Sequence, residues 1–333
     1  MEENNQEHFI KNIEIKNFKC FEDFKAEGFG RVNLIGGKNN VGKTAFMEAT
    51  YVNTRVEDVK SFTSALTDVK DMRENLNILA ELITNKFKEK ERHIKSLELF
   101  NKLNIISNVN NISYNIEEID SVKKYIFDIK DKTKTINVND FSFIYSRKSN
   151  VNFIDNFGLS NIEIIHSYSF IQRKDEESYL NSLLKLLDSR IESFKIIDEI
   201  PQCKVNNKYC EITEFGDGVR HLISIVTSLY QSEDGYIYID ELDNGIHYTM
   251  LDELWTVVLL ISQKLNVQVF ATTHSKECIE SFNRVQLKKL DETQDTYYFE
   301  MARNSKTDRI FMSKIDSEQL EYELSHQGRF RGE

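Results

Sequence analysis

The sequence has 333 residues, of which 40% are hydrophobic, and its 43 basic and 54 acidic side chains give a formal net charge of −11. This length fits one large domain with an insertion, or two domains, and the acidic balance argues against a surface coated with basic side chains, although a local basic groove stays open. No apolar run approaches the roughly 18 residues of a membrane helix, and the polar start MEENNQEHF lacks the pattern of a signal peptide, so we expect a cytoplasmic protein with no membrane partner.

Strands and helices are predicted to alternate along the chain. Residues 9–35 alternate apolar and polar positions and end at glycines, as short strands do. The elements expected after them are two or more helices over about 51–103, a small partly exposed sheet within 104–150, a helix over 178–194, a hairpin over 203–210, alternating strands and helices to 275, and two strands with a short helix in the tail. Because residues 51–150 differ in composition from the rest, we assign residues 1–50 and 151–333 to a core and residues 51–150 to an insertion lobe beside it.

The four cysteines form no Cys-x-x-Cys pair, so we expect reduced thiols rather than a disulfide scaffold or a structural zinc site. Cys203 and Cys210 flank an Asn206-Asn207 turn, which predicts that they face each other across the hairpin. We interpret that pair as packing.

A glycine-rich loop occupies residues 37–44, GKNNVGKT, which match the pattern GxxxxGK[ST], follow the strand RVNLI and precede a helix. In such a P-loop, backbone N–H groups surround the β- and γ-phosphates of a nucleotide, the lysine neutralises charge and the threonine hydroxyl holds Mg²⁺. A chance glycine turn is the alternative, and the flanking strand and helix disfavour it. The predicted nucleotide-binding residues are Gly37, Lys38, Asn39, Asn40, Val41, Gly42, Lys43, Thr44 and Ala45.

An apolar strand, YIYI, ends in two carboxylates, Asp240 and Glu241. This is the Walker B pattern that a P-loop requires on a neighbouring strand. Asp240 would orient Mg²⁺, directly or through water, and Glu241 would polarise the attacking water as general base. The alternative is a strand that ends at a solvated acidic turn.

A second pair of glycines lies in residues 215–220, FGDGVR, immediately before the apolar helix HLISIVTSLY. We call this segment the glycine signature. It forms another helix N-terminus suited to phosphate, and one nucleotide cannot easily use both glycine turns of one chain. We therefore expect this turn to contact ATP held by a second copy in a head-to-tail dimer, with a plain helix cap as the alternative.

A buried-looking strand over residues 266–273 leads directly to His274. In a parallel sheet the carboxyl end of a strand faces the ligand crevice, so His274 would contact the γ-phosphate and sense its loss. With Glu241 and Lys43 it completes the predicted catalytic set. A structural histidine is the alternative.

These motifs occur in the order found in ABC-type ATPase heads, and the sequence resembles the RecF/SMC/OLD-like group of them. The stretches GDGVRHL, IYIDELDNGIHY and QVFATTHSKECIESF resemble the small AAA-type ATPases of bacterial anti-phage defence operons, of the AriA/PARIS-like kind. The motif match covers about residues 9–50 and 210–283. It implies an α/β fold: a P-loop ABC-ATPase head with N-terminal antiparallel strands, a central mostly parallel sheet and a helical and mixed insertion lobe.

The resemblance also implies a homodimer, or a higher homo-oligomer, that closes around ATP and Mg²⁺. The residues that it assigns to the dimer contact are Gly216, Asp217, Gly218 and Arg220, acting in trans, and the D-loop-like turn Asp243, Asn244 and Gly245 at the seam. The transporter signature LSGGQ is absent, and Gln172 is the candidate for the Q-loop glutamine that contacts the metal. About 60 residues follow His274, too few for the Toprim nuclease of OLD proteins, so we expect any nuclease to be a separate chain.

Three functional hypotheses follow from these observations. The first is an ATPase that gates a separate effector, a nuclease or toxin, in anti-phage defence. The second is a RecF-like DNA-repair ATPase acting on DNA ends or gaps, for which a basic groove would have to come from the lysines of residues 123–134. The third is a slow-turnover, ATP-bound scaffold or sensor that sequesters a toxin or nuclease.

Overall fold

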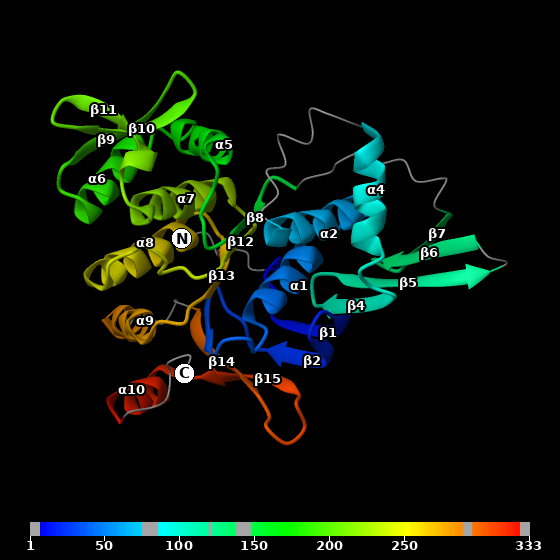
Figure 1. The fold of residues 1–333 in the computed structure, drawn as a ribbon. Helices are drawn as coiled ribbons and strands as arrows, with labels where there is room; N and C mark the ends of the chain where they lie inside the picture. The colour runs from blue at the N-terminus through cyan, green and yellow to red at the C-terminus, as the bar shows by residue number, and fades with distance from the viewer. Residues whose placement is uncertain (1–6, 75–85, 120–121, 138–147, 289–294, 327–333) are drawn as a thin grey trace.

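The computed structural model describes residues 7–74, 86–119, 122–137, 148–288 and 295–326. Its centre is a six-stranded sheet in the order β15-β14-β3-β13-β12-β8, in which only the β14–β15 pair is antiparallel (Figure 1). The strands of this sheet are β3 (Val32–Gly37), β8 (Val151–Ile154), β12 (Tyr236–Ile239), β13 (Gln268–Thr272), β14 (Thr296–Arg303) and β15 (Ile310–Ile315). The expected central, mostly parallel sheet is confirmed.

Helices cover both faces of the central sheet, as a parallel sheet requires. On one face, Leu34 and Val269 join a core built with the later helices; on the other, Ile35 and Phe270 join a core built with the early helices and the N-terminal strands. The helices of the first core are α5 (Asn161–Gln172), α6 (Glu177–Leu187), α7 (Asp217–Gln231), α8 (Leu251–Lys264), α9 (Lys276–Lys288) and α10 (Ser317–Ser325). Those of the second are α1 (Lys43–Arg55), α2 (Val59–Glu74) and α4 (Lys86–Leu97).

A second, antiparallel sheet has the order β2-β1-β4-β5-β6-β7. Its strands are β1 (Asn12–Phe18), β2 (Phe21–Glu27), β4 (Lys102–Ser107), β5 (Asn111–Ile119), β6 (Val122–Ile129) and β7 (Lys132–Asn137). Of the strands predicted before residue 35, β1 and β2 therefore form one sheet with the strands predicted after residue 104, because β4 pairs with β1 from Ile13 to Lys16, whereas the RVNLI strand is β3 of the central sheet.

The segment 51–150 is consequently joined to the core more closely than its composition suggests. Helix α1 runs past residue 50 to Arg55, and Leu103 and Ile105 of β4 share a buried cluster with Ile15 and Phe46. Apolar alternation predicts a strand but does not reveal its partner, which explains why the sequence suggested a separate sheet. The lobe boundaries at residues 50 and 150 stay a prediction, and residues 138–147 lie outside the described part.

A three-stranded sheet of β9 (Ile191–Ile197), β10 (Ile200–Val205) and β11 (Lys208–Glu211) precedes α7. The predicted hairpin is confirmed, with Cys203 opposite Cys210 and both thiols free. The helix predicted over residues 178–194 was too long, since α6 ends at Leu187 and the following turn opens β9. Ile191 and Phe194 of IESF are both buried in β9 instead.

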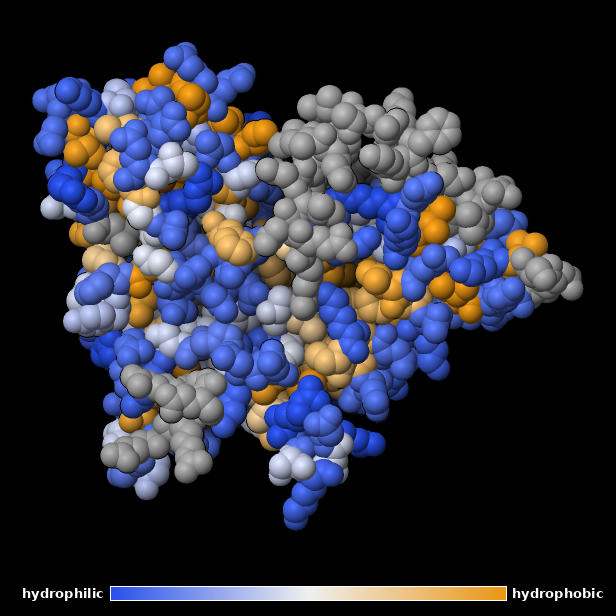
Figure 2. Space-filling view, viewed as in Figure 1, coloured by the Kyte–Doolittle hydropathy of each residue, from blue (hydrophilic) through white to orange (hydrophobic). Residues whose placement is uncertain are grey.

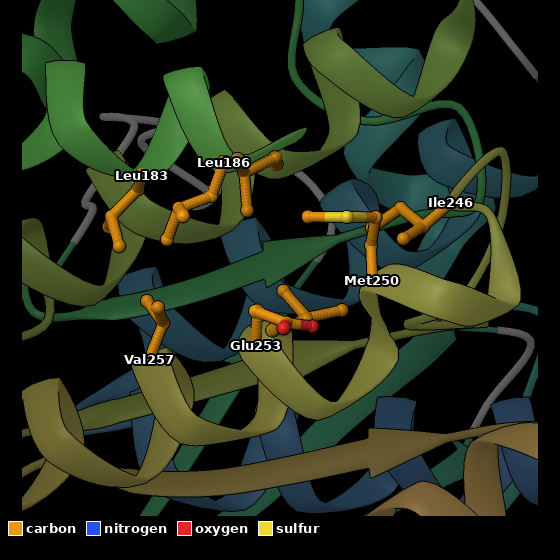
Figure 3. A pocket seen from close by; sticks show the side chains of 8 residues that line it. Leu183, Leu186, Ile246, Met250, Glu253 and Val257 are labelled. Carbon is orange, nitrogen blue, oxygen red and sulfur yellow. The ribbon is translucent and has the colours of Figure 1, made fainter. Parts of the chain in front are cut away.

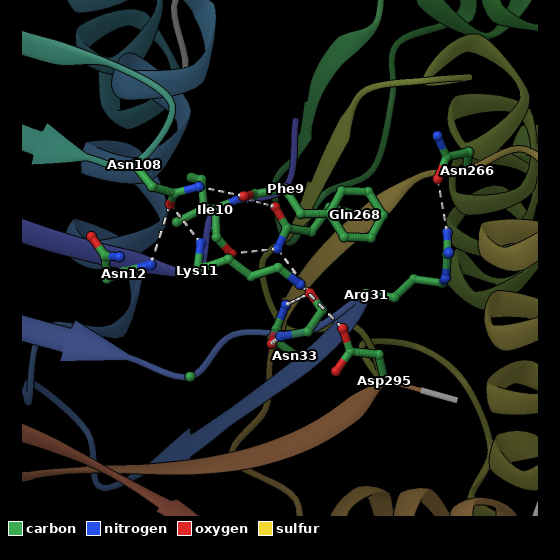
Figure 4. A network of polar contacts seen from close by, with 12 residues as sticks. Phe9, Ile10, Lys11, Asn12, Arg31, Asn33, Asn108, Asn266, Gln268 and Asp295 are labelled. Carbon is green, nitrogen blue, oxygen red and sulfur yellow. Dashed lines mark hydrogen bonds and ion pairs between the residues drawn. The ribbon is translucent and has the colours of Figure 1, made fainter. Parts of the chain in front are cut away.

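Buried amides tie the N-terminal segment to the central sheet (Figure 4). The Gln268 side chain accepts the Ile10 N–H at 2.8 Å and donates to the carbonyls of Ile10 and Gly30, each at 2.8 Å. Asn33 donates to the carbonyls of Gly30 and Val269. Because these amides are fully buried, their hydrogen bonds offset a large desolvation cost and fix where β3 lies between its neighbours.

Hydrophilic side chains cover most of the face seen in Figure 2, with hydrophobic patches between them. Within the described ranges, none of the helices is both long and apolar enough to cross a bilayer.

Candidate functional site

The P-loop lies where β3 ends and α1 begins, at the carboxyl edge of the central sheet. Gly37 and Gly42 have φ of 136° and 101°, values that side chains rarely adopt. A Cβ at Gly37 would also stand 2.2 Å from the carbonyl oxygen of Met301 on β14. With Gly42 as N-cap, the free N–H groups of the first turn of α1 point into the loop and form a natural anion site.

Lys43 is buried at the centre of this loop. Its ammonium donates to the carbonyls of Gly37 at 2.7 Å and Lys38 at 3.0 Å, and it lies 3.1 Å from Nδ1 of His274. Burial lowers the pKa of Lys43 to about 8, which leaves it mainly protonated at neutral pH. The carboxylates that oppose this shift are Asp240, Glu300 and Glu241.

Asp240 lies at the end of β12 and faces the P-loop helix. The Thr44 hydroxyl donates to one carboxylate oxygen at 2.9 Å, and the Thr272 hydroxyl of β13 donates to the other at 2.6 Å. A threonine hydroxyl and a carboxylate so close together present the hard oxygen donors that Mg²⁺ prefers. The residues present therefore fit a magnesium ion held by Thr44 and Asp240.

Glu241 adopts a left-handed backbone with φ of 53°, which is unusual for a residue with a side chain. Its N–H donates to the Thr272 hydroxyl at 2.9 Å, and its carbonyl accepts the N–H of Asn244 at 2.9 Å. The side chain is 41% exposed and lies 3.7 Å from Nε2 of His274. Burial raises the pKa of Glu241, and Asp240 and other nearby acidic groups add to that shift, so the carboxyl is a stronger base than a solvated glutamate.

His274 lies two residues after the end of β13 and joins the two halves of the site, with one ring nitrogen toward Lys43 and the other toward Glu241. Burial lowers the pKa of His274, and the charge of Lys43 lowers it further. A neutral imidazole is therefore favoured here, able to donate one hydrogen bond and accept another.

The glycine signature begins α7, but its two glycines face different surroundings. Gly216 is exposed, and a Cβ there would meet no atom within 4 Å. A Cβ at Gly218 would stand 2.2 Å from the carbonyl oxygen of Gly245 in the same chain. The glycine at 218 thus serves a contact within the chain, whereas Gly216 and Asp217 are open to a partner.

Arg220 is also held within its own chain. Its guanidinium donates to the carbonyl of Leu159 at 2.8 Å and to the side chain of Asn161 at 2.9 Å. In the single chain this guanidinium is bonded to the start of α5, and the trans role of Arg220 stays a prediction. The D-loop-like turn has internal contacts as well, with Asp243 accepting from Thr273 at 2.6 Å and Asn244 donating to the carbonyl of Asn156.

Gln172 does not lie at this site. It is exposed at the last position of α5, and Glu176, four residues later, accepts from Tyr230 near the end of α7 and from Lys264 at the end of α8. Those helix ends lead into the starts of β12 and β13, the edge of the sheet opposite Asp240. The apolar run before Gln172 is a helix rather than the strand that a Q-loop follows.

Sequence reasoning missed three residues that the structure brings near the site. Asp155 follows β8, whose Ile154 carbonyl accepts the N–H of Asp240, and burial raises the pKa of the Asp155 carboxyl. Glu300 of β14 pairs in register with Gly36 and contributes to the field at Lys43. Thr272 is the third. Thr272 could have been suggested by its position just before Thr273 and His274. Asp155 and Glu300 could not, since neither β8 nor β14 carries a motif.

A small apolar pocket lies between α6 and α8 (Figure 3). Leu183, Leu186, Met250 and Val257 line it together with a single charged side chain, Glu253. Such a lining offers nothing to phosphate, so the nucleotide site is assigned to the P-loop edge.

Known proteins match both the sequence and the fold. The AAA ATPase domain model matches residues 167–279, which include the glycine signature, the Walker B strand and His274. A protein of Helicobacter pylori (strain ATCC 700392 / 26695) named ATP/GTP phosphatase is 26% identical to this chain over 83% of it and 88% of its own length. The chain is an ATPase.

Among solved structures, an SMC head bound to the C-terminal winged-helix domain of ScpA matches this ATPase with a TM-score of 0.53 and 9% identity. The match covers 92% of this chain and 98% of that one. It shows the fold: this chain is folded like an SMC head. The expected fold class is confirmed.

Proposed function

We propose that this ATPase hydrolyses ATP at the P-loop edge with the residues predicted from the sequence. Lys43 and the first turn of α1 would hold the β- and γ-phosphates, and Thr44 with Asp240 would hold Mg²⁺. The metal, when bound, neutralises charge on the phosphates. Glu241 would take the proton of the attacking water, and His274, between Lys43 and Glu241, would contact the γ-phosphate.

We further propose that two copies close head-to-tail around ATP. The observation that carries this proposal is the exposed Gly216 at the start of α7, with open space where a side chain would stand. The free N–H groups of the first turn of α7 need an anion, and the γ-phosphate on a partner's P-loop would supply one. Two exposed aromatic side chains support a protein contact near the D-loop-like turn: Phe157, next to the Asn156 that Asn244 contacts, is 64% exposed, and Tyr248, three residues after Gly245, is 63% exposed.

The ATP cycle would gate a separate effector protein, a nuclease or toxin, in cytoplasmic anti-phage defence. This biological role rests on the resemblance of three motif segments to defence ATPases, and the lobe of residues 51–150 is the surface that we assign to the trigger or partner. A slow-turnover scaffold remains the alternative, and its mark would be tight effector binding with little hydrolysis.

The lysines of residues 123–134 give less support to a RecF-like DNA role. Lys123 donates to Glu98 at 2.7 Å, and Lys123 and Lys124 stand opposite Glu118 and Glu117 in the β5–β6 register. These carboxylates offset the charge that a phosphate backbone would require.

A tryptophan at Gly216 tests the dimer. In a Glu241→Gln background, Mg-ATP should convert monomers to dimers in analytical ultracentrifugation, and adding Gly216→Trp should prevent this while leaving ATP affinity within about 2-fold of the parent, since the residue does not touch its own P-loop. Glu318→Trp, an exposed position on α10, is the matched control and should dimerise normally.

Gly218→Trp cannot serve as this probe, because the side chain would displace Gly245 within the same chain. We expect that substitution to lower the unfolding temperature, which Gly216→Trp should not do. If the Gly216→Trp and Glu318→Trp proteins dimerise equally, the signature is not the trans contact.

A further inference from the structure

The hairpin of β10 and β11, which stands beside α5 and α6 in Figure 1, carries two of the four cysteines. Cys203 and Cys210 are directly opposite in the register, so their side chains leave the sheet on the same face. Cys203 is fully buried and Cys210 is partly exposed, and both thiols are free. The proposed ATPase mechanism uses neither of them.

The geometry of the hairpin brings the two cysteines within reach of a disulfide. Asn206 and Asn207, which join the strands, have φ of 51° and 61°, as in a two-residue type I′ turn. Opposite residues of an antiparallel pair have their Cα atoms about 4.5–5.5 Å apart, inside the range of about 4.4–6.8 Å that a disulfide spans. Their Cβ atoms lie about 4.5–5.5 Å apart, somewhat beyond the 3.5–4.5 Å of a disulfide. The bond would therefore require a small shift of the strands, and a strained disulfide is easily reduced again.

The burial of the two thiols sets the order of their reaction. An oxidant in solution reaches Cys210, whereas Cys203 lies in the apolar core with Phe194 and Ile212. Burial raises the pKa of Cys203 to about 12, so near neutral pH this cysteine stays a thiol and does not react first.

A small-molecule disulfide such as oxidised glutathione supplies the oxidant. The Cys210 thiolate would attack one glutathione sulfur and release one reduced glutathione. Cys203, on losing its proton, would then attack the Cys210 sulfur and release the second. Two protein thiols are oxidised to one disulfide, and one glutathione disulfide is reduced to two thiols.

The hairpin is joined closely to the glycine signature. A 3₁₀ turn, Ile212–Glu214, is all that separates β11 from the signature. The N–H of Glu211, the last residue of β11, donates to the Glu214 side chain at 3.2 Å, and Ile212 is buried in the same apolar core as Cys203. A shift of β11 toward β10 would therefore pull on the segment that presents the signature.

We propose that Cys203 and Cys210 form a reversible disulfide under oxidising conditions, and that this bond slows ATP turnover by displacing the glycine signature. The site of oxidation depends on the hairpin alone. Its effect on turnover rests on the proposed function, in which the signature contacts ATP held by a partner.

The test follows thiols and turnover together in a Cys20→Ser background, which removes the exposed cysteine. Oxidised glutathione added to the folded protein should convert two of the three remaining thiols to a disulfide, and peptide mass mapping should join Cys203 to Cys210. We expect kcat for ATP to fall about fivefold, the lower end of typical coupling between two sites, and a thiol reductant to restore it. Cys210→Ser in the same background is the matched variant, and it should form no disulfide and keep its own kcat after the same treatment.

Cys203→Ala separates the disulfide from simple modification of Cys210. This variant should stop at the mixed disulfide of Cys210 with glutathione and keep its kcat. Absence of the Cys203–Cys210 bond after treatment, or an equal fall of kcat in Cys203→Ala, would overturn the proposal, and a bond that forms without changing kcat would overturn its regulatory role. Failure of the proposed function is seen separately, because Gly216→Trp tests the dimer contact by ultracentrifugation and the thiol measurement does not depend on ATP.

Discussion

Replacing Glu241 by glutamine should lower kcat for ATP by about 10²–10⁴-fold, the range that a general base contributes. The amide has the shape of the carboxyl but cannot accept a proton from water. Because Lys43, Thr44 and Asp240 are untouched, the Kd for ATP should stay within about 2-fold of wild type. Phosphate release measures the first quantity, and titration with a fluorescent ATP analogue measures the second.

The surroundings of Glu241 also predict the effect of this substitution on stability. Asp240 and Asp243 raise the pKa of Glu241 through like-charge repulsion, added to the larger effect of burial. A neutral glutamine relieves that repulsion, so the unfolding temperature should be unchanged or higher. Glu253→Gln, which removes one negative charge from an exposed position on α8, is the control and should keep full turnover. Turnover at the wild-type rate in Glu241→Gln would remove this residue from the mechanism.

Contiguous motifs explain why much of the site could be predicted from the sequence. The P-loop and Walker B segments each combine an apolar strand with the residues that follow it, so the strand and its chemistry are read together. Asp240 and Thr44, 196 positions apart, were expected to share a metal, and their side chains lie 2.9 Å from each other. The general rule that carboxyl ends of neighbouring parallel strands share an edge was enough to bring them together.

What the sequence could not predict depends on contacts between distant segments. Glu300 reaches the P-loop because β14 pairs with β3, and Asp155 because β8 pairs with β12, and neither pairing leaves a mark on the local pattern. The assignment of Gln172 to a Q-loop failed for a related reason. The apolar run before it suggests a strand, and an apolar run of moderate length fits a helix as well.

The direction in which a glycine faces is likewise invisible in the sequence. Gly216 and Gly218 occupy one helix N-terminus, and spacing alone gives both the same role. Only the packing of Gly245 against Gly218 separates the exposed glycine from the one that makes room within the chain. The same limit applies to Arg220, whose residue type suits a phosphate but whose guanidinium is bonded to Leu159.

Replacing Lys43 by alanine should weaken ATP binding about 10–150-fold, because a hydrogen bond to a charged group contributes roughly 1.5–3 kcal/mol. Glu241→Gln lowers kcat, whereas Lys43→Ala should raise the Kd for ATP, which calorimetry measures without turnover. The ammonium is buried and donates to the carbonyls of Gly37 and Lys38, so it is already directed into the loop where phosphate would lie.

Stability distinguishes this binding role from a structural one. Burial lowers the pKa of Lys43 to about 8, which means that the folded protein holds this charge at a cost. Removing it should leave the unfolding temperature unchanged or higher, even though ATP binding is lost. Lys264→Ala removes an equal charge at the opposite edge of the sheet, where the lysine bonds Glu176, and should bind ATP normally. Equal ATP affinity in the Lys43 and Lys264 variants would place the phosphates elsewhere and refute the assignment of the P-loop.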